Sequence, residues 1–147
     1  MAGLPHRPLG SSGIEVSCLA LGSWRTYERM SREDGVAVMH AARQAGIDFL
    51  DDARYNDETG NAPIPTGYSE VVFGELFRAA GWVRDEVTVA NKLWWEFWSD
   101  QTAAEELDAS LGRMQLDPRR SHLHRAAAGG ARARTARGAG GGADRRR

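Results

Sequence analysis

The apolar positions of the chain fall into short runs that alternate with helical stripes. Apolar runs at 18–21, 47–50 and 87–91 each end at a glycine or a polar residue, which indicates buried strands. Because these runs are solidly apolar and do not alternate, they are typical of parallel strands. A helical pattern follows each run. The strand-helix order, repeated three times, predicts an α/β architecture.

The helical stripes carry start and stop signals. Ser31 can cap a helix that Gly46 ends. A second helix is predicted from Ser69 to Gly81, and a third from about Thr102. The apolar residues of the three stripes are Val36, Met39, Ala42, Val72, Phe73, Leu76, Phe77, Ala80, Ala104, Leu107, Leu111 and Met114.

The segment before the first strand, residues 7–17, predicts a short hairpin with Gly and Ser in its turn. Doubly wound sheets and eight-stranded barrels both contain repeated strand-helix units. A doubly wound dinucleotide domain usually has a Gly-rich fingerprint after its first strand. Gly22-Ser23-Trp24-Arg25 does not supply one. The sequence therefore favours the N-terminal part of a (β/α)₈ TIM barrel, preceded by a β-hairpin.

Composition places the chain among ordinary globular proteins, since 41% of its 147 residues are hydrophobic and 27% are charged. A single cysteine, Cys18, excludes an internal disulfide framework and suits a reducing compartment. The N-terminus lacks the apolar core of a signal peptide, and no apolar stretch reaches membrane length. We therefore expect a cytoplasmic protein without a membrane partner.

Charge divides the chain near Asp117. Residues 118–147 hold nine arginines and one acidic residue, whereas residues 1–117 hold ten basic and nineteen acidic residues. We expect 1–117 to form one domain and 118–147 to be a disordered tail, because the tail is poor in large apolar residues. An Arg-rich arm could bind nucleic-acid phosphates. The tail has no aromatic residue for base stacking, so specific nucleic-acid binding is not expected.

Polar side chains follow the predicted strands at their carboxyl ends, where barrel enzymes carry their chemistry. Asp51, Asp52 and Tyr55 follow the second strand, and Lys92, the only lysine of the chain, follows the third. An ammonium beside a phenol lowers the tyrosine pKa from its usual value of about 10. A carboxylate paired with that lysine would fix its position. Tyr55 could then donate a proton to a carbonyl oxygen.

Each of these residues also has a purely structural interpretation. Tyr55 could be a half-buried packing residue, the two aspartates could form a turn, and Lys92 could be solvated. The strand register favours Asp51 over Asp52 as the partner of Lys92, without deciding between them. The aromatic residues between 94 and 98 could line an apolar substrate pocket or pack beneath their loop.

Five sequence segments follow one another along the chain. They are Arg7-Pro8-Leu9-Gly10-x-Ser12-Gly13-x-x-Val16-Ser17, Leu21-Gly22-Ser23-Trp24, Gly46-Ile47-Asp48-Phe49-Leu50-Asp51-x-Ala53 with Tyr55, Gly67-x-Ser69-Glu70 with Gly74, and Val87-x-Val89-Ala90-Asn91-Lys92. Together they resemble the N-terminal portion of an aldo-keto reductase, over residues 7–117. The resemblance implies a barrel enzyme that reduces aldehydes and ketones with NADPH and binds a small-molecule carbonyl substrate.

The resemblance also implies site residues. Tyr55 would be the proton donor, Lys92 the partner that lowers its pKa, and Asp51 the carboxylate paired with Lys92. The residues implied near the nicotinamide end of the cofactor are Gly22, Ser23, Trp24 and Asp51. No metal is implied. Tyr55 lies one residue closer to Asp51 than in the family pattern, and Asn56 follows it where the family has glycine.

The resemblance ends near Asp117. The family has a fourth apolar strand there that ends in a catalytic histidine, whereas this chain continues with Pro118-Arg119-Arg120-Ser121-His122. Common codons for residues 119–123, shifted by one nucleotide, can encode Val-Asp-Leu-Ile-Tyr, so we expect a frameshifted tail. Three βα units leave both sheet edges open and one apolar face uncovered. We expect an impaired reductase; the alternative is an inactive remnant or binding fragment of the same fold.

Overall fold

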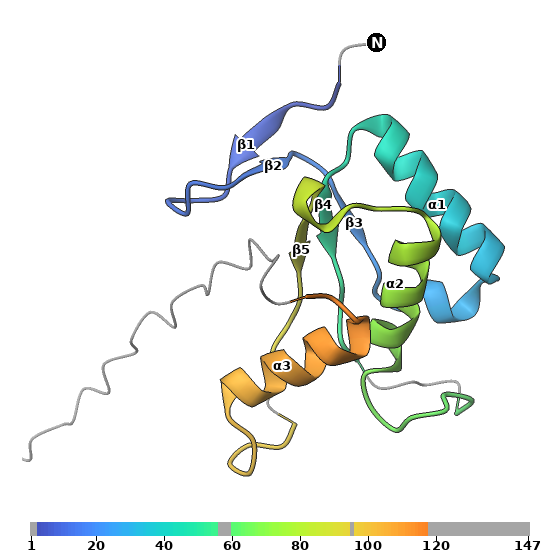
Figure 1. Cartoon of the computed structure of the whole chain (residues 1–147), viewed down its shortest axis with the longest axis vertical. Helices are drawn as coiled ribbons and strands as arrows, with labels where there is room; N and C mark the ends of the chain where they lie inside the picture. The colour runs from blue at the N-terminus through green and yellow to red at the C-terminus, as the bar shows by residue number, and fades with distance from the viewer. Residues whose placement is uncertain (1–2, 56–59, 95, 118–147) are drawn as a thin grey trace, which may run out of the picture.

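The computed structural model describes residues 3–55, 60–94 and 96–117. A hairpin precedes three parallel strands, each followed by a helix (Figure 1). The elements are β1 (His6–Pro8), β2 (Glu15–Ser17), β3 (Ala20–Gly22), η1 (Tyr27–Arg29), α1 (Arg32–Ala45), β4 (Phe49–Asp51), α2 (Tyr68–Ala79), η2 (Arg84–Glu86), β5 (Thr88–Ala90) and α3 (Ala103–Met114). The tail predicted at 118–147 lies outside the described residues.

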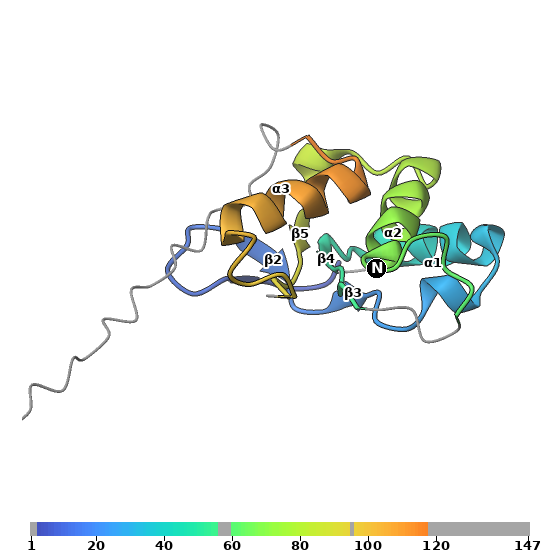
Figure 2. The same cartoon turned by 90° about the horizontal axis from the view of Figure 1, so that it is seen from below.

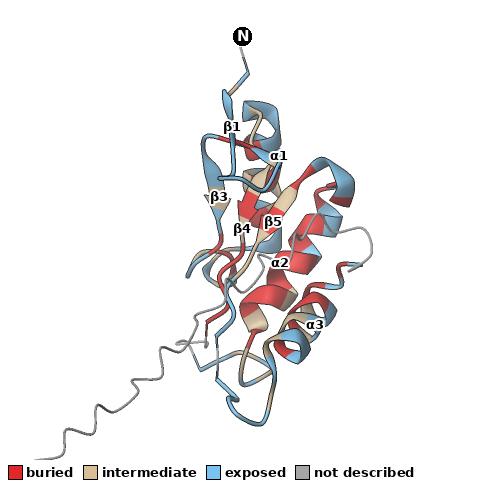
Figure 3. Ribbon diagram, turned by 90° about the vertical axis from the view of Figure 1, so that its left-hand side faces the viewer, coloured by how far each residue is buried: buried red, intermediate tan, exposed pale blue. Residues whose placement is uncertain are grey.

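The three parallel strands lie in the order β3-β4-β5. Their register places Leu21 opposite Leu50, and Leu50 opposite Val89. Figures 2 and 3 show the helices on one side of this sheet. The predicted α/β fold with three βα units is confirmed, and the described residues form no closed barrel. On the other side of the sheet Ala20 and Gly22 of β3 are exposed, as expected for a sheet covered on one face.

Each strand is shorter than the apolar run that predicted it. At the starts of two of these runs, backbone N–H groups form hydrogen bonds outside the sheet. The backbone N–H of Cys18 donates to the carbonyl of Pro5 at 2.9 Å, next to the hairpin. The N–H of Ile47 donates to the carbonyl of Ala42 at 3.0 Å, closing the end of α1. β3 and β4 therefore begin later in the chain than the apolar runs predicted.

The helix boundaries follow the predicted caps closely. The side chain of Ser31 accepts a hydrogen bond from the backbone N–H of Asp34 at 3.0 Å, and Gly46 ends α1 with φ of +84°. That left-handed conformation suits glycine. Thr102 and Glu105 form a capping box at the start of α3.

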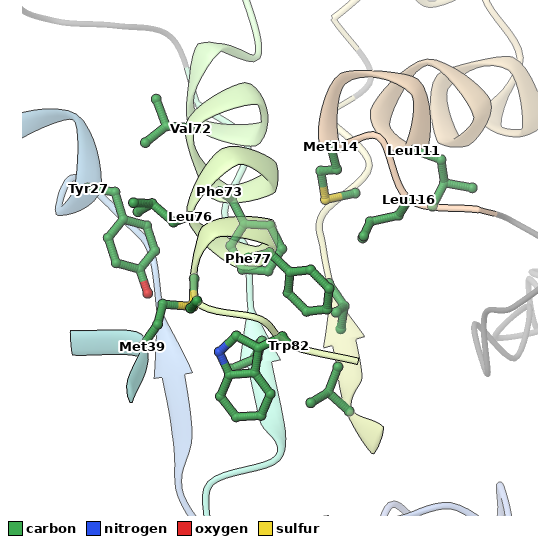
Figure 4. Packing of buried hydrophobic residues seen from close by; sticks show 14 residues of the cluster. Tyr27, Met39, Val72, Phe73, Leu76, Phe77, Trp82, Leu111, Met114 and Leu116 are labelled. Carbon is green, nitrogen blue, oxygen red and sulfur yellow. The ribbon is translucent and has the colours of Figure 1, made fainter. Parts of the chain in front are cut away.

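The core lies between the sheet and the helices. Figure 4 shows Met39 of α1, Phe73 and Leu76 of α2, and Met114 of α3 directed into one cluster. Each of these side chains is at most 2% exposed. Among the described residues, none of the helices combines the length and the apolar character that crossing a membrane requires.

Gly74 allows α2 to approach the end of α3. A Cβ atom at this position would lie 2.1 Å from the carbonyl oxygen of Met114. Backbone atoms cannot rotate away, so we expect Gly74→Ala to destabilise the fold by about 1–3 kcal/mol or more. The matched control is Gly112→Ala in α3, where nothing lies within 4 Å of the new Cβ. It should stabilise the fold by about 0.5–1 kcal/mol. Urea unfolding followed by circular dichroism measures both, and equal effects would contradict the prediction.

The hairpin is tied to the start of β4 through Asp48. One carboxylate oxygen of Asp48 pairs with Nε2 of His6 at 2.8 Å, and the other accepts from the backbone N–H of Ser17 at 2.8 Å. The hydrogen bond to Asp48 raises the pKa of His6. Burial alone would raise the pKa of Asp48, but the hydrogen bonds from Ser17 and His6 lower it overall. These contacts hold the hairpin at the amino-terminal end of the strands, away from the site described next.

Candidate active site

The carboxyl ends of the three parallel strands meet around one cavity. The register aligns Gly22, Asp51 and Ala90, so the residues that follow them lie side by side. The cavity has a volume of about 550 Å³. Its lining residues are Trp24, Arg25, Asp51, Ala53, Arg54, Tyr55, Lys92 and Trp94. The three residues predicted to be catalytic, Asp51, Tyr55 and Lys92, are all in this set.

Lys92 forms an ion pair with Asp51. Its Nζ lies 2.9 Å from Oδ1 and 3.1 Å from Oδ2 of that carboxylate. The partner is Asp51 and not Asp52. The two side chains are 53% and 42% exposed, so solvent weakens the attraction between them. The pair therefore serves to orient the ammonium at the cavity wall more than to stabilise the fold.

Asp52 is fully buried and is not among the residues that line the cavity. Its Oδ1 accepts a hydrogen bond from Oγ of Ser23 at 2.6 Å, and Ser23 in turn accepts from the backbone N–H of Ala53 at 2.9 Å. Burial raises the pKa of Asp52 to about 7, although the hydrogen bond from Ser23 opposes this effect. The Ser23 hydroxyl is thus used within the protein, joining the ends of β3 and β4.

Tyr55 is buried at the cavity wall, and its hydroxyl donates a hydrogen bond to the carboxylate of Glu28. Burial raises the pKa of Tyr55, and the hydrogen bond to Glu28 raises it further. This direction is opposite to the one expected from a nearby lysine. The physical reason is that burial disfavours the charged phenolate and the Glu28 carboxylate opposes it further, while the ammonium of Lys92 is paired with Asp51.

The residues predicted near the nicotinamide divide into two pairs. Trp24 and Asp51 line the cavity, and Trp24 is 64% exposed. Ser23 is buried and Gly22 is exposed at the end of β3. The guanidinium of Arg25 lies 5.0 Å from the centre of the Trp24 ring and covers one face of the indole. The remaining indole surface suits stacking with a flat ring such as the nicotinamide of a cofactor.

Three cations line the cavity. Lys92 pairs with Asp51, Arg54 pairs with Glu96 and Glu106, and Arg25 lies over the ring of Trp24. No glycine-rich turn for the phosphates of such a cofactor lies among the described lining residues. Nor do the described residues contain a group of three or more His, Cys, Asp or Glu side chains placed to hold a metal ion.

Arg54 is a cavity residue that the sequence analysis missed. Its guanidinium is 2% exposed and bonds to Glu106 at 2.6 Å and to Glu96 at 2.8 Å. The partners lie more than forty positions away in the chain, at the start of α3 and in the loop before it. No local spacing could have indicated this pairing, which ties that loop to the end of β4.

Asn91 and Glu70 belong to the sequence motifs, but only the structure shows what their side chains do. The side-chain oxygen of Asn91 accepts from the backbone N–H of Lys92 at 2.7 Å and of Arg54 at 3.3 Å. Its amide nitrogen donates to Glu70 at 2.6 Å. Asn91 thereby holds the ends of β4 and β5 to the first turn of α2. A polar residue at the end of an apolar strand was the available signal.

The aromatic segment after Lys92 does not behave as one unit. Trp94 lines the cavity, as the pocket interpretation expected. Phe97 and Trp98 are 47% and 67% exposed, so they are not packed beneath the loop. Trp95 lies outside the described residues.

Comparison with known proteins agrees with the architecture around this cavity. The sequence profile of the aldo/keto reductase family matches residues 18–119. The chain belongs to this family. A rice protein described as a voltage-gated potassium channel beta subunit is 30% identical over 122 residues, which cover 78% of this chain and 35% of the rice protein.

Solved structures of the family show the same fold. An aldo-keto reductase from Pseudomonas aeruginosa is 30% identical, with a TM-score of 0.56 over 76% of this chain and 43% of that protein. An aldo/keto reductase from Brucella melitensis, at 24% identity, has a TM-score of 0.52 over 80% of this chain and 38% of that protein. The chain thus spans about a third of the rice relative and under half of these barrels.

Proposed function

We propose that residues 18–117 carry the proton-donor part of an aldo-keto reductase site, which reduces aldehydes and ketones to alcohols with NADPH. Family membership supports an oxidoreductase. The observation that carries the proposal is the meeting of Asp51, Tyr55 and Lys92 on one cavity at the carboxyl ends of three parallel strands. Active sites of barrel enzymes lie at this end. The substrate would be a small-molecule carbonyl compound.

In this proposal each side chain has a defined task. When bound, NADPH supplies the hydride. Tyr55 donates its proton to the carbonyl oxygen as negative charge develops there. Lys92, oriented by Asp51, adds positive charge beside that oxygen. Trp24 and Trp94 provide apolar walls that position the substrate and exclude water.

The second candidate is a catalytically inactive remnant or binding fragment of the same fold. Two observations favour it for a polypeptide of these 147 residues. The sheet is covered by helices on one side (Figure 3), and the described cavity residues offer no glycine-rich phosphate turn. We propose that this polypeptide alone does not turn over, although it carries the acid part of the site. The free thiol of Cys18 suits a reducing compartment such as the cytoplasm.

Grafting tests the proposal. Residues 18–117 replace the matching segment of the Pseudomonas aeruginosa aldo-keto reductase, which supplies the remaining strands. We expect the graft to oxidise NADPH in the presence of 4-nitrobenzaldehyde, measured as loss of absorbance by the reduced cofactor. The 147-residue chain should show neither turnover nor a fluorescence change on addition of NADPH.

The intact relative and a circular dichroism spectrum of the graft serve as controls. A graft that folds and binds NADPH but does not reduce the aldehyde would exclude the proposed function and leave the inactive fragment. Turnover by the 147-residue chain would show that its three βα units suffice.

A further inference from the structure

The hydroxyl of Tyr55 is held by the loop that joins β3 to α1. It donates a hydrogen bond to Glu28, and the backbone N–H of Arg25 faces the same oxygen as a donor. Lys92 lies on the same cavity but pairs with Asp51. The proton of the proposed acid thus points to a carboxylate of this loop.

The contacts of this loop hold the side chain of Glu28 beside the hydroxyl of Tyr55. The Glu28 side chain is only 7% exposed, and its Oε1 lies 3.9 Å from Nε of Arg29, whose own side chain is 51% exposed. Glu28 lies in η1, which the side chain of Tyr27, 2% exposed, anchors in the core beside α2 (Figure 4). Arg25 has φ of +54°, a left-handed conformation that residues other than glycine rarely adopt. Such a conformation costs energy and persists only where surrounding contacts enforce it.

We propose that Glu28 is a positioning residue that holds the proton of Tyr55 in the resting site and must release it before a carbonyl oxygen can receive it. This inference rests on the proposed function of Tyr55 as the acid. A phenol has one proton, so it cannot donate to Glu28 and to a substrate at full strength together. The substrate oxygen must therefore displace the carboxylate as the hydrogen-bond acceptor.

The groups around Tyr55 agree with this assignment. Burial is the largest cause of the raised pKa of Tyr55, followed by Glu28, and the carboxylate of Asp52 acts in the same direction. The N–H of Arg25 acts in the opposite direction. Lys92 lines the same cavity, but Asp51 compensates its charge. Glu28 is thus the carboxylate in direct contact with the phenol.

The test is the variant Glu28→Gln in the full 147-residue chain, with tyrosine labelled by ¹³C at the phenol carbon. The amide keeps the size of the side chain but removes its charge. We expect the pKa of Tyr55, followed by NMR against pH, to fall by about one to three pH units, the usual effect of one adjacent charge. Tyr55→Phe assigns its resonance, and the resonances of Tyr27 and Tyr68 report on the rest of the fold.

Two further variants keep the result interpretable. Lys92→Met removes a different charge near the cavity and should move the pKa of Tyr55 less than Glu28→Gln does, because Asp51 compensates the lysine charge. Glu28→Asp keeps the charge but withdraws it from the hydroxyl, so a smaller fall is expected. An unchanged Tyr55 titration in a folded Glu28→Gln chain would overturn the inference. Because the titration needs neither NADPH nor turnover, an inactive graft would contradict the proposed function without contradicting the role of Glu28.

Discussion

Replacing Tyr55 by phenylalanine in the grafted reductase is expected to lower kcat/KM about a hundredfold or more. A positioned general acid contributes about 10²–10⁴-fold to the rate, and phenylalanine removes only the hydroxyl. Tyr55 lines the cavity together with Lys92 and Asp51, whereas its ring is buried and would keep its packing. The loss should therefore appear in kcat. Because phenylalanine also leaves the nearly buried carboxylate of Glu28 without its hydrogen-bond donor, we expect a loss of stability of about 1–3 kcal/mol as well.

Tyr68→Phe is the matched control for this experiment. The Tyr68 hydroxyl accepts a hydrogen bond from Arg32 at 3.3 Å at the start of α2 and is not among the cavity-lining residues. Its removal should leave kcat unchanged. Rates are measured from NADPH absorbance, with cofactor binding and thermal unfolding recorded for each variant. Equal activity of the two variants would show that Tyr55 is not the general acid.

Glu70→Ala is expected to destabilise the chain by about 3–5 kcal/mol. Glu70 is fully buried in the first turn of α2, where its carboxylate accepts from Nε of Arg113 and from the amide of Asn91. Alanine would leave an arginine that is 21% exposed without its counter-ion and a polar amide without its acceptor. Removing one partner of a buried ion pair has a cost of this size.

The matched control lies on the same helix. Glu75 pairs with Arg32 at 2.9 Å, but both side chains are almost half exposed. Glu75→Ala should cost about 0–1 kcal/mol, as is usual for exposed pairs. Urea unfolding monitored by circular dichroism gives both free energies of unfolding. If Glu70→Ala unfolds no more easily than Glu75→Ala, the buried network of Glu70 does not stabilise the fold.

The Glu70 variant also bears on the cavity. The amide nitrogen of Asn91 donates to Glu70, and its side-chain oxygen accepts from the backbone N–H groups of Lys92 and Arg54. Loss of the carboxylate removes the group that orients the amide. The carboxyl ends of β4 and β5 would then lose their link to α2, so stability and cavity geometry are joined in one set of hydrogen bonds.

The sequence predicted the α/β order and the helix ends because these depend on local signals. Ser31, Gly46 and Thr102 act at the positions where they stand in the chain. The strand ends were predicted less accurately, because the N–H groups of Cys18 and Ile47 donate hydrogen bonds to carbonyls next to the hairpin and in α1. Those competing partners have no local signature.

The candidate site was predictable to the extent that strand ends determine it. Register alone brings Asp51 and Lys92 together, because parallel strands end at one edge of the sheet. Glu28 could not be predicted in the same way. Its place beside Tyr55 depends on the path of residues 23–31, including the left-handed Arg25, and no periodicity describes that path.

The ammonium of Lys92 has a further consequence. It is the only lysine amine of the chain, and about half of its side chain is open to solvent beside the cavity. Amine-directed reagents such as acyl donors, crosslinkers or fluorescent tags thus have one side-chain target, with the α-amino group as the other reactive amine. A dye attached there would sit at the mouth of the cavity without any engineered attachment point.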